Sequence, residues 1–171
     1  TKDKVTGEAS SRLFKLADSP EMMLGLSVKS IEKAIYPVGF YKTKSKRIKE
    51  ICKTLLDDYD GVVPDEIDEL LKLNGVGRKT ANLTVTLGYG KMGICVDTHV
   101  HRISNRLGLV KTKTPDQTEF ALRKTLPQKH WLIYNDLLVT YGQNLCVPIS
   151  PWCSKCKISK YCKRLGVKKS R

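Results

Sequence analysis

Apolar residues recur at steps of three and four along most of this chain, while runs in which apolar and polar residues alternate are scarce. In the segment 42–59 this spacing gathers the apolar side chains on one side of a helix and leaves Lys44, Lys46, Arg47 and Lys53 largely outside that stripe. The pattern predicts an amphipathic helix with a basic outer side.

Three segments carry a proline next to an acid, a combination that often starts a helix. They are 19–21 (Ser-Pro-Glu), 64–66 (Pro-Asp-Glu) and 114–116 (Thr-Pro-Asp), and two of them also offer a capping hydroxyl. We expect a helix to begin at each of the three.

The apolar spacing predicts further helices over about 67–73, 78–87, 98–107, 115–126 and 130–145. The first two of these meet across a tight glycine turn. We find no internal repeat with a period of 20–50 residues, which excludes a solenoid. The predicted fold class is all-α.

Composition adds a charge to this picture. The 171 residues carry 31 Lys and Arg against 17 Asp and Glu, for a net charge of +14. No apolar run approaches the ~18 residues that span a bilayer, and the N-terminal segment lacks a signal-peptide pattern, so we expect an intracellular protein without a membrane partner. The positive charge favours nucleic acid as the partner, ahead of an anionic membrane surface or an acidic protein.

The cysteines separate into a cluster and two single residues. The cluster has the spacing Cys146-x6-Cys153-x2-Cys156-x5-Cys162. Such a set in an intracellular protein indicates a metal site rather than disulfides, and its four thiolates suit either Zn²⁺ or an iron–sulfur cluster. The long intervals lean toward a cubane cluster. The remaining two cysteines, at positions 52 and 95, are expected to be packed as small apolar residues.

The glycine turn lies in the segment 73–81 (Leu-Asn-Gly-Val-Gly-Arg-Lys-Thr-Ala). Gly75 and Gly77 allow positive φ angles and a close approach to the backbone, and the helix that follows presents free N–H groups. Such a turn can hold a phosphate. The alternative is a plain corner between two helices, and the basic composition favours the phosphate.

Lys79 and Asp97 are candidates for chemistry. We expect Arg78 and the helix dipole to place Lys79 in a positive potential that favours the neutral, nucleophilic amine. Asp97 begins the segment 97–103 and would equally serve as an ordinary helix N-cap. Taken singly, a cap for the aspartate and a solvated or phosphate-binding role for the lysine are the commoner roles.

Taken together, these motifs resemble the endonuclease III family of helix-hairpin-helix DNA glycosylases. The resemblance lies in the segments 36–46, 73–82 and 96–108, in the separation of eighteen residues between Lys79 and Asp97, and in the cysteine spacing. It covers essentially the whole chain. The family has two further helices, and a glutamine that fills the gap left by a flipped base, before the point matched by Thr1, so the chain is expected to be N-terminally shortened.

The resemblance implies a fold of two helical lobes. Residues 1–91 would form a six-helix-barrel-type domain that contains the helix-hairpin-helix, and residues 92–171 a helical domain with a basic tail. The cysteines of the loop 146–162 would hold a [4Fe-4S] cluster, and Lys79 and Asp97 would come from different lobes.

The resemblance also implies a function, the excision of oxidised pyrimidines from duplex DNA followed by cleavage of the abasic site by β-elimination. Lys79 would be the nucleophile and Asp97 its electrostatic partner, in an enzyme expected to be a monomer in the cytoplasm or nucleoid of a prokaryote or the nucleus of a eukaryote. An adenine mismatch glycosylase of the same superfamily is disfavoured because that group lacks the lysine. A non-catalytic DNA-binding module is the other alternative.

DNA contacts are expected at three places. The hairpin would offer Gly75, Val76, Gly77 and Arg78, and Phe40 matches an apolar wedge, against the alternative of a core aromatic. The loop 147–152 lacks the basic residues common in the family, so the contact would pass to Lys155, Lys157 and Lys160. Asn74 replaces the usual proline and should make the turn less rigid.

Overall fold

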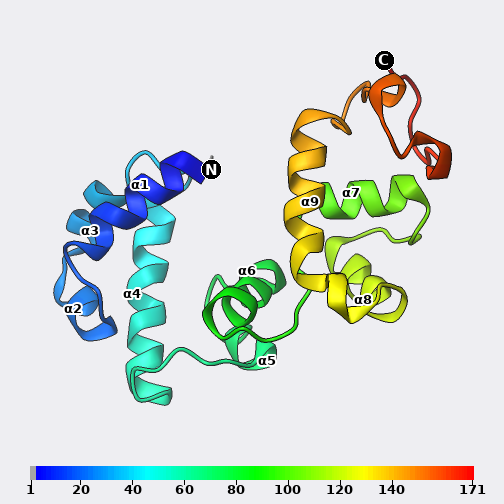
Figure 1. Ribbon diagram of the computed structural model, residues 1–171. Coiled ribbons are helices and arrows are strands. Elements are labelled where there is room, and N and C mark those ends of the chain that lie inside the picture. The colour runs from blue at the N-terminus through cyan, green and yellow to red at the C-terminus, as the bar shows by residue number, and fades with distance from the viewer. Residues whose placement is uncertain (1–2) are drawn as a thin grey trace. The chain divides into compact units, whose positions relative to one another are not determined.

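The computed structural model describes residues 3–171, in which every regular element is a helix (Figure 1). The all-α prediction is confirmed for these residues. By contacts within the chain they divide into two compact units, Thr1–Val76 and Gly77–Arg171. In the described part of the chain no helix combines the length and the apolar character needed to cross a bilayer.

The first unit is built on the long helix α4. Its helices are α1 (Asp3–Phe14), α2 (Pro20–Gly25), α3 (Val28–Ile35), α4 (Tyr41–Asp58) and α5 (Ile67–Leu70). Helices α2 and α3 pack against α4, and α1 packs against α3. The buried core includes Leu13, Met23, Ile31, Ile35 and Cys52.

Local signals explain part of this unit. The Ser19 hydroxyl accepts a hydrogen bond from the Met22 N–H, so the predicted helix start at Pro20 is confirmed. The predicted start at Pro64 is wrong, because the chain stays extended at Glu66 and the first helical bond runs from the Leu70 N–H to the Glu66 carbonyl. The sequence did not single out α1 or α3 as separate helices.

The second unit surrounds α7 and α9. Its helices are α6 (Arg78–Leu83), α7 (Thr98–Leu107), α8 (Pro115–Thr125) and α9 (Trp131–Asn144), with a π-helical turn η1 (Thr84–Gly88) and the 3-10 turns η2 (Gln128–His130), η3 (Cys153–Lys155) and η4 (Ser159–Tyr161). Helix α7 packs against α8 and α9 around Ile94, Val100, Ile103, Leu122 and Leu138. The helices predicted over 98–107, 115–126 and 130–145 are observed within one residue at each end.

The compact units divide the chain earlier than the expected boundary between residues 91 and 92. The reason lies in the contacts of α6 and η1. Gly93 packs against Asn82 and Thr86, and the Lys91 N–H donates to the Val85 carbonyl. Helix α6, which carries Lys79, therefore lies in the same compact unit as Asp97.

Candidate functional site

The glycine turn is held close to α4. Gly75 has φ +87°, and a Cβ at this position would lie 2.6 Å from Cδ of Arg47, so both the backbone and the space require glycine. Gly77 has φ −100° and open space around it, in the extended conformation of the residue that caps α6. The expectation of a positive φ is confirmed at Gly75 and wrong at Gly77.

Asn74 ties this turn to α4. Its side-chain amide donates a 2.7 Å hydrogen bond to Oε2 of Glu50. Asparagine is expected to make the turn less rigid than proline would. The hydrogen bond to Glu50 restrains the turn by fixing it to α4 instead of by restricting the backbone φ angle.

Arg78 is half-buried and points toward α8. Its Nε and Nη2 donate to the two carboxylate oxygens of Glu119, each at 2.9 Å, and its guanidinium lies 4.5 Å from the centre of the Phe120 ring. Glu119 is 2% exposed and also accepts a 2.9 Å hydrogen bond from Nε of Arg123. The Arg78 side chain, expected to face a phosphate, is thus held in a bidentate ion pair with Glu119.

Burial works against the charge of Glu119, but hydrogen bonds from Arg78 and Arg123 outweigh it and hold the pKa of this carboxyl below 4.5. The carboxylate in turn balances the charge of Arg78. The positive potential expected beside Lys79 from Arg78 and the helix dipole is therefore partly offset, on the side of Arg78, by Glu119.

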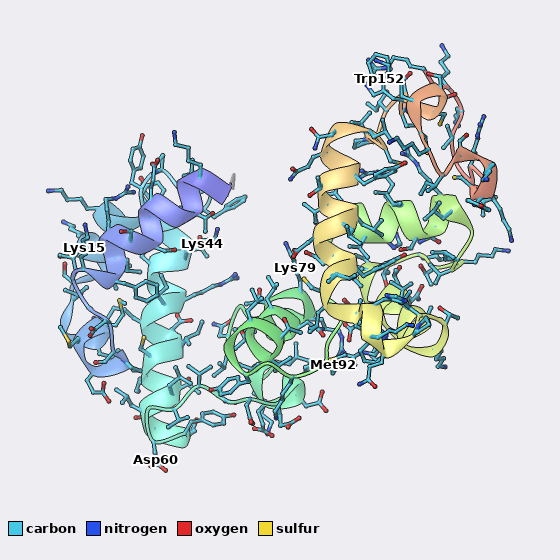
Figure 2. The ribbon with its side chains drawn as sticks, viewed as in Figure 1. Lys15, Lys44, Asp60, Lys79, Met92 and Trp152 are labelled. Carbon is cyan, nitrogen blue, oxygen red and sulfur yellow. The ribbon has the colours of Figure 1, made fainter. Side chains whose placement is uncertain are left out.

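The buried thiol of Cys95 connects the segment before Asp97 to the backbone of Lys79. The Cys95 thiol contacts the Lys79 carbonyl at 3.8 Å, and Cys95 precedes Asp97 by two residues. Burial raises the pKa of Cys95 to about 11, with the charge of Lys79 lowering it and that of Asp97 raising it. Cys95 therefore stays a packed thiol, as predicted, and its contact with the Lys79 carbonyl joins the start of α6 to the segment before Asp97. Figure 2 shows Lys79 on α6, with its side chain exposed.

Asp97 is also the N-cap of α7. Its Oδ1 accepts hydrogen bonds from the N–H groups of His99 and Val100, each at 2.8 Å. These bonds satisfy two free donors of the helix and fix the direction of the carboxylate. The capping role considered for Asp97 is confirmed, and it leaves a half-buried carboxylate in a set position.

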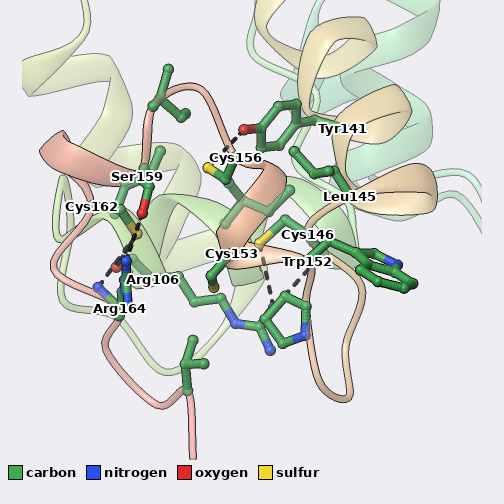
Figure 3. A pocket seen from close by; sticks show the side chains of 15 residues that line it. Arg106, Tyr141, Leu145, Cys146, Trp152, Cys153, Cys156, Ser159, Cys162 and Arg164 are labelled. Carbon is green, nitrogen blue, oxygen red and sulfur yellow. Dashed lines mark hydrogen bonds between the residues drawn. The ribbon is translucent and has the colours of Figure 1, made fainter. Parts of the chain in front are cut away.

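The cysteines of the cluster line one pocket (Figure 3). The residues that line it with sulfur are Cys146, Cys153, Cys156 and Cys162. No group of three or more metal-binding side chains within the described residues is gathered closely enough to hold an ion. The donor set still fits a thiolate-bound metal, because Nη1 of Arg106 lies 3.4 Å from Sγ of Cys146 and the Tyr141 hydroxyl lies 2.9 Å from Sγ of Cys156.

Two arginines of α7 fasten the start of this cysteine loop. Arg102 donates to the carbonyl of Cys146, and Arg106 donates to the carbonyls of Val147 and Pro148. Arg106 is 8% exposed. Sequence reasoning missed both residues, although their separation of four positions places them on one face of a helix.

The remaining candidates for DNA contact lie at the surface. Phe40 is 85% exposed and adopts a left-handed conformation with φ 59°, so the alternative of a core aromatic is wrong. The ammonium of Lys155 lies 4.5 Å from the Trp152 ring, and that of Lys160 lies 4.9 Å from the Tyr161 ring. Lys157 is also exposed.

Comparison with known proteins gives consistent matches. Residues 1–128 match the family described as HhH-GPD superfamily base excision DNA repair protein. Endonuclease III of Thermotoga maritima is 44% identical over 95% of this chain and 76% of its own length. Endonuclease III homolog 2, chloroplastic, of Arabidopsis thaliana is 43% identical over 95% of this chain, which spans only 44% of that relative. A trapped endonuclease III–DNA covalent intermediate superposes with a TM-score of 0.88 at 35% identity, covering 95% of this chain and 77% of that one.

Replacing Glu119 with Gln should destabilise the protein by roughly 3 kcal/mol at neutral pH, because two arginines would lose their buried partner. Since the pKa of Glu119 is lowered on folding, its contribution is full above 4.5 and is lost as the pH falls further. Urea unfolding followed by circular dichroism at a series of pH values should therefore show a weaker acid dependence in Glu119→Gln. The exposed Asp116→Asn, on the same helix, is the control, and an equal loss in both variants would contradict the prediction.

The cap at Asp97 can be separated from its charge. Asp97→Ala should lower the free energy of unfolding by about 1 kcal/mol. Asp97→Ser keeps a capping oxygen and should lower it by only about 0.3 kcal/mol. Thermal unfolding of both variants measures the difference. Equal stability of the two would show that the cap contributes nothing.

Proposed function

Because this chain belongs to the HhH-GPD superfamily of base excision DNA repair proteins, and within it to the endonuclease III family, it is a DNA glycosylase, and we propose that it excises oxidised pyrimidines from duplex DNA and then cleaves the abasic site. The observation that carries the proposal is that Lys79 and Asp97 lie in one compact unit, where Cys95, two residues before Asp97, contacts the Lys79 carbonyl.

In this proposal Lys79 is the nucleophile. Its uncharged amine attacks C1′ of the deoxyribose, the bond to the base breaks, and the base departs with the electron pair of that bond and takes up a proton. Opening of the sugar ring then gives a Schiff base between Nζ and C1′. Loss of a proton from C2′ expels the 3′ phosphate by β-elimination, and hydrolysis of the Schiff base frees the enzyme.

Asp97 acts on the same carbon. Positive charge develops at C1′ as the bond to the base breaks, and a fixed carboxylate stabilises that charge without reorienting. The two hydrogen bonds at Oδ1 supply this fixed orientation. The carboxylate also receives the proton that the attacking amine must lose.

The reaction requires the nucleotide to leave the duplex, since a side chain cannot reach C1′ while the base is stacked. Phe40, exposed at the start of α4, is proposed as an apolar wedge at the vacated position. The backbone of Gly75, Val76 and Gly77 is proposed to hold phosphate. Arg78 would contribute its backbone N–H, because its side chain is engaged by Glu119.

We propose that the cysteine pocket holds a [4Fe-4S] cluster through Cys146, Cys153, Cys156 and Cys162. When bound, the group supplies a covalent cross-link that orders the loop 146–162. Arg106 donates to Sγ of Cys146 at 3.4 Å, which places a cation next to this proposed ligand. An ordered loop would present Lys155, Lys157 and Lys160 to the backbone of duplex DNA, with the protein acting as a monomer.

Incubation with duplex DNA that carries one thymine glycol, followed by borohydride, should give a covalent adduct, because borohydride reduces the Schiff base to a stable amine. Lys79→Ala should abolish the adduct, and Asp97→Ser, which keeps the cap, should reduce the rate of trapping by roughly a hundredfold or more. The exposed Lys111→Ala is the control and should trap normally.

Trapping that survives in Lys79→Ala would refute the assignment of the nucleophile. A wild-type protein that binds this DNA and gives no adduct would favour the non-catalytic DNA-binding module.

The purified protein should contain iron and sulfide in equal amounts and show broad charge-transfer absorption in the visible range. Cys153→Ser should lose this absorption, whereas Cys52→Ala, at a packed cysteine of the first unit, should keep it. Zinc in place of iron on elemental analysis would overturn the cluster assignment.

A further inference from the structure

The outer face of α4 carries a stripe of polar side chains that meets the glycine turn. The stripe runs along the helix at steps of three and four, so its members lie on one side. A cleft of about 270 Å³ opens between this stripe and the turn, lined by Lys42, Thr43, Lys46, Arg47, Glu50 and Asn74. All of these residues belong to the first unit.

We infer that this cleft binds a phosphodiester group of duplex DNA, as a contact that side chains make in addition to the backbone of the hairpin. The inference rests on the proposed function, since it takes DNA as the substrate. In this contact, cationic side chains on flexible stems bind an anionic phosphate. Such a contact fixes the position of the protein on the DNA without reading the base sequence.

Packing makes α4 and the turn one surface. The stem of Arg47 lies directly on Gly75, with Cδ 2.6 Å from the place a Cβ would take and Nη1 3.2 Å from it. The guanidinium is therefore held at the edge of the turn. A phosphate that approached the turn at Gly75 would meet this group at the same time.

The acid in the cleft is already engaged. Glu50 accepts the 2.7 Å hydrogen bond from Asn74, and this pair closes one end of the cleft. The cleft therefore contains three cations, Lys42, Lys46 and Arg47, and one acid. Across the residues that the structure describes, none of these cations forms an ion pair with an acid.

The contrast with neighbouring basic residues supports this choice. Arg78, at the other side of the turn in sequence, has its charge balanced by Glu119. Lys49, on α4 itself, donates to the carbonyls of Leu24 and Leu26 and so fastens α2. The cations of the cleft make no comparable structural contact in the described residues, apart from the packing of Arg47 on the turn. Their charged groups can therefore bind a phosphate.

The test measures how the affinity for duplex DNA depends on salt. In Lys42→Gln/Lys46→Gln, the slope of log K against log salt should fall by about 2 in magnitude, and the affinity should drop roughly tenfold or more at about 0.1 M salt. The DNA concentration for half-maximal borohydride trapping should rise in parallel.

The matched control is Lys29→Gln/Lys33→Gln on α3. It removes the same charge, at the same spacing, from exposed lysines of the same unit, and it should keep both the slope and the half-maximal concentration of the wild type. Circular dichroism of both double variants checks that they fold.

Equal loss of slope in the two double variants would overturn the inference, because a general loss of positive charge would then explain it, and the proposed function would stand. An unchanged slope in Lys42→Gln/Lys46→Gln would overturn it as well. A wild-type protein that neither binds DNA in a salt-dependent way nor gives an adduct would instead refute the proposed function together with this inference.

Discussion

The second unit depends on one buried carboxylate. Glu119 lies on α8, and the arginines that it binds come from α6 and from its own helix, so a single side chain links the element that carries Lys79 to the core around α7 and α8. A charge at this depth is tolerable only because both oxygens are satisfied. The same interaction holds the half-buried side chain of Arg78, the residue next to Lys79, against α8.

The sequence predicted those structural features in which a residue interacts with its near neighbours along the chain. The capping residues Ser19, Thr114 and Asp97 each bond to an N–H two or three positions ahead, and the helices that follow begin where this predicts. The positive φ of Gly75 belongs to the same class of local signal. The all-α fold class follows from the sum of such signals and from the apolar spacing.

What the sequence could not supply were partners distant along the chain. Glu119 is separated from Arg78 by 41 positions, and Arg106 from the Pro148 carbonyl by 42. No local pattern identifies an arginine whose partner lies about 40 positions away, so the ion pair of Arg78 was not predicted and Arg106 was missed. The extended backbone before α5 was also not predicted, because a proline followed by acids is compatible with a loop as well as with a first turn.

The left-handed backbone at Phe40 has an evolutionary consequence. A bulky side chain in this conformation costs about 1–2 kcal/mol, and its exposed ring recovers little of that by burial. Under selection for thermal resistance alone, lineages would drift to glycine or asparagine at this position and gain stability. An aromatic ring that is retained at this position would therefore indicate selection for a function of the ring in a complex, because the ring does not stabilise the free protein.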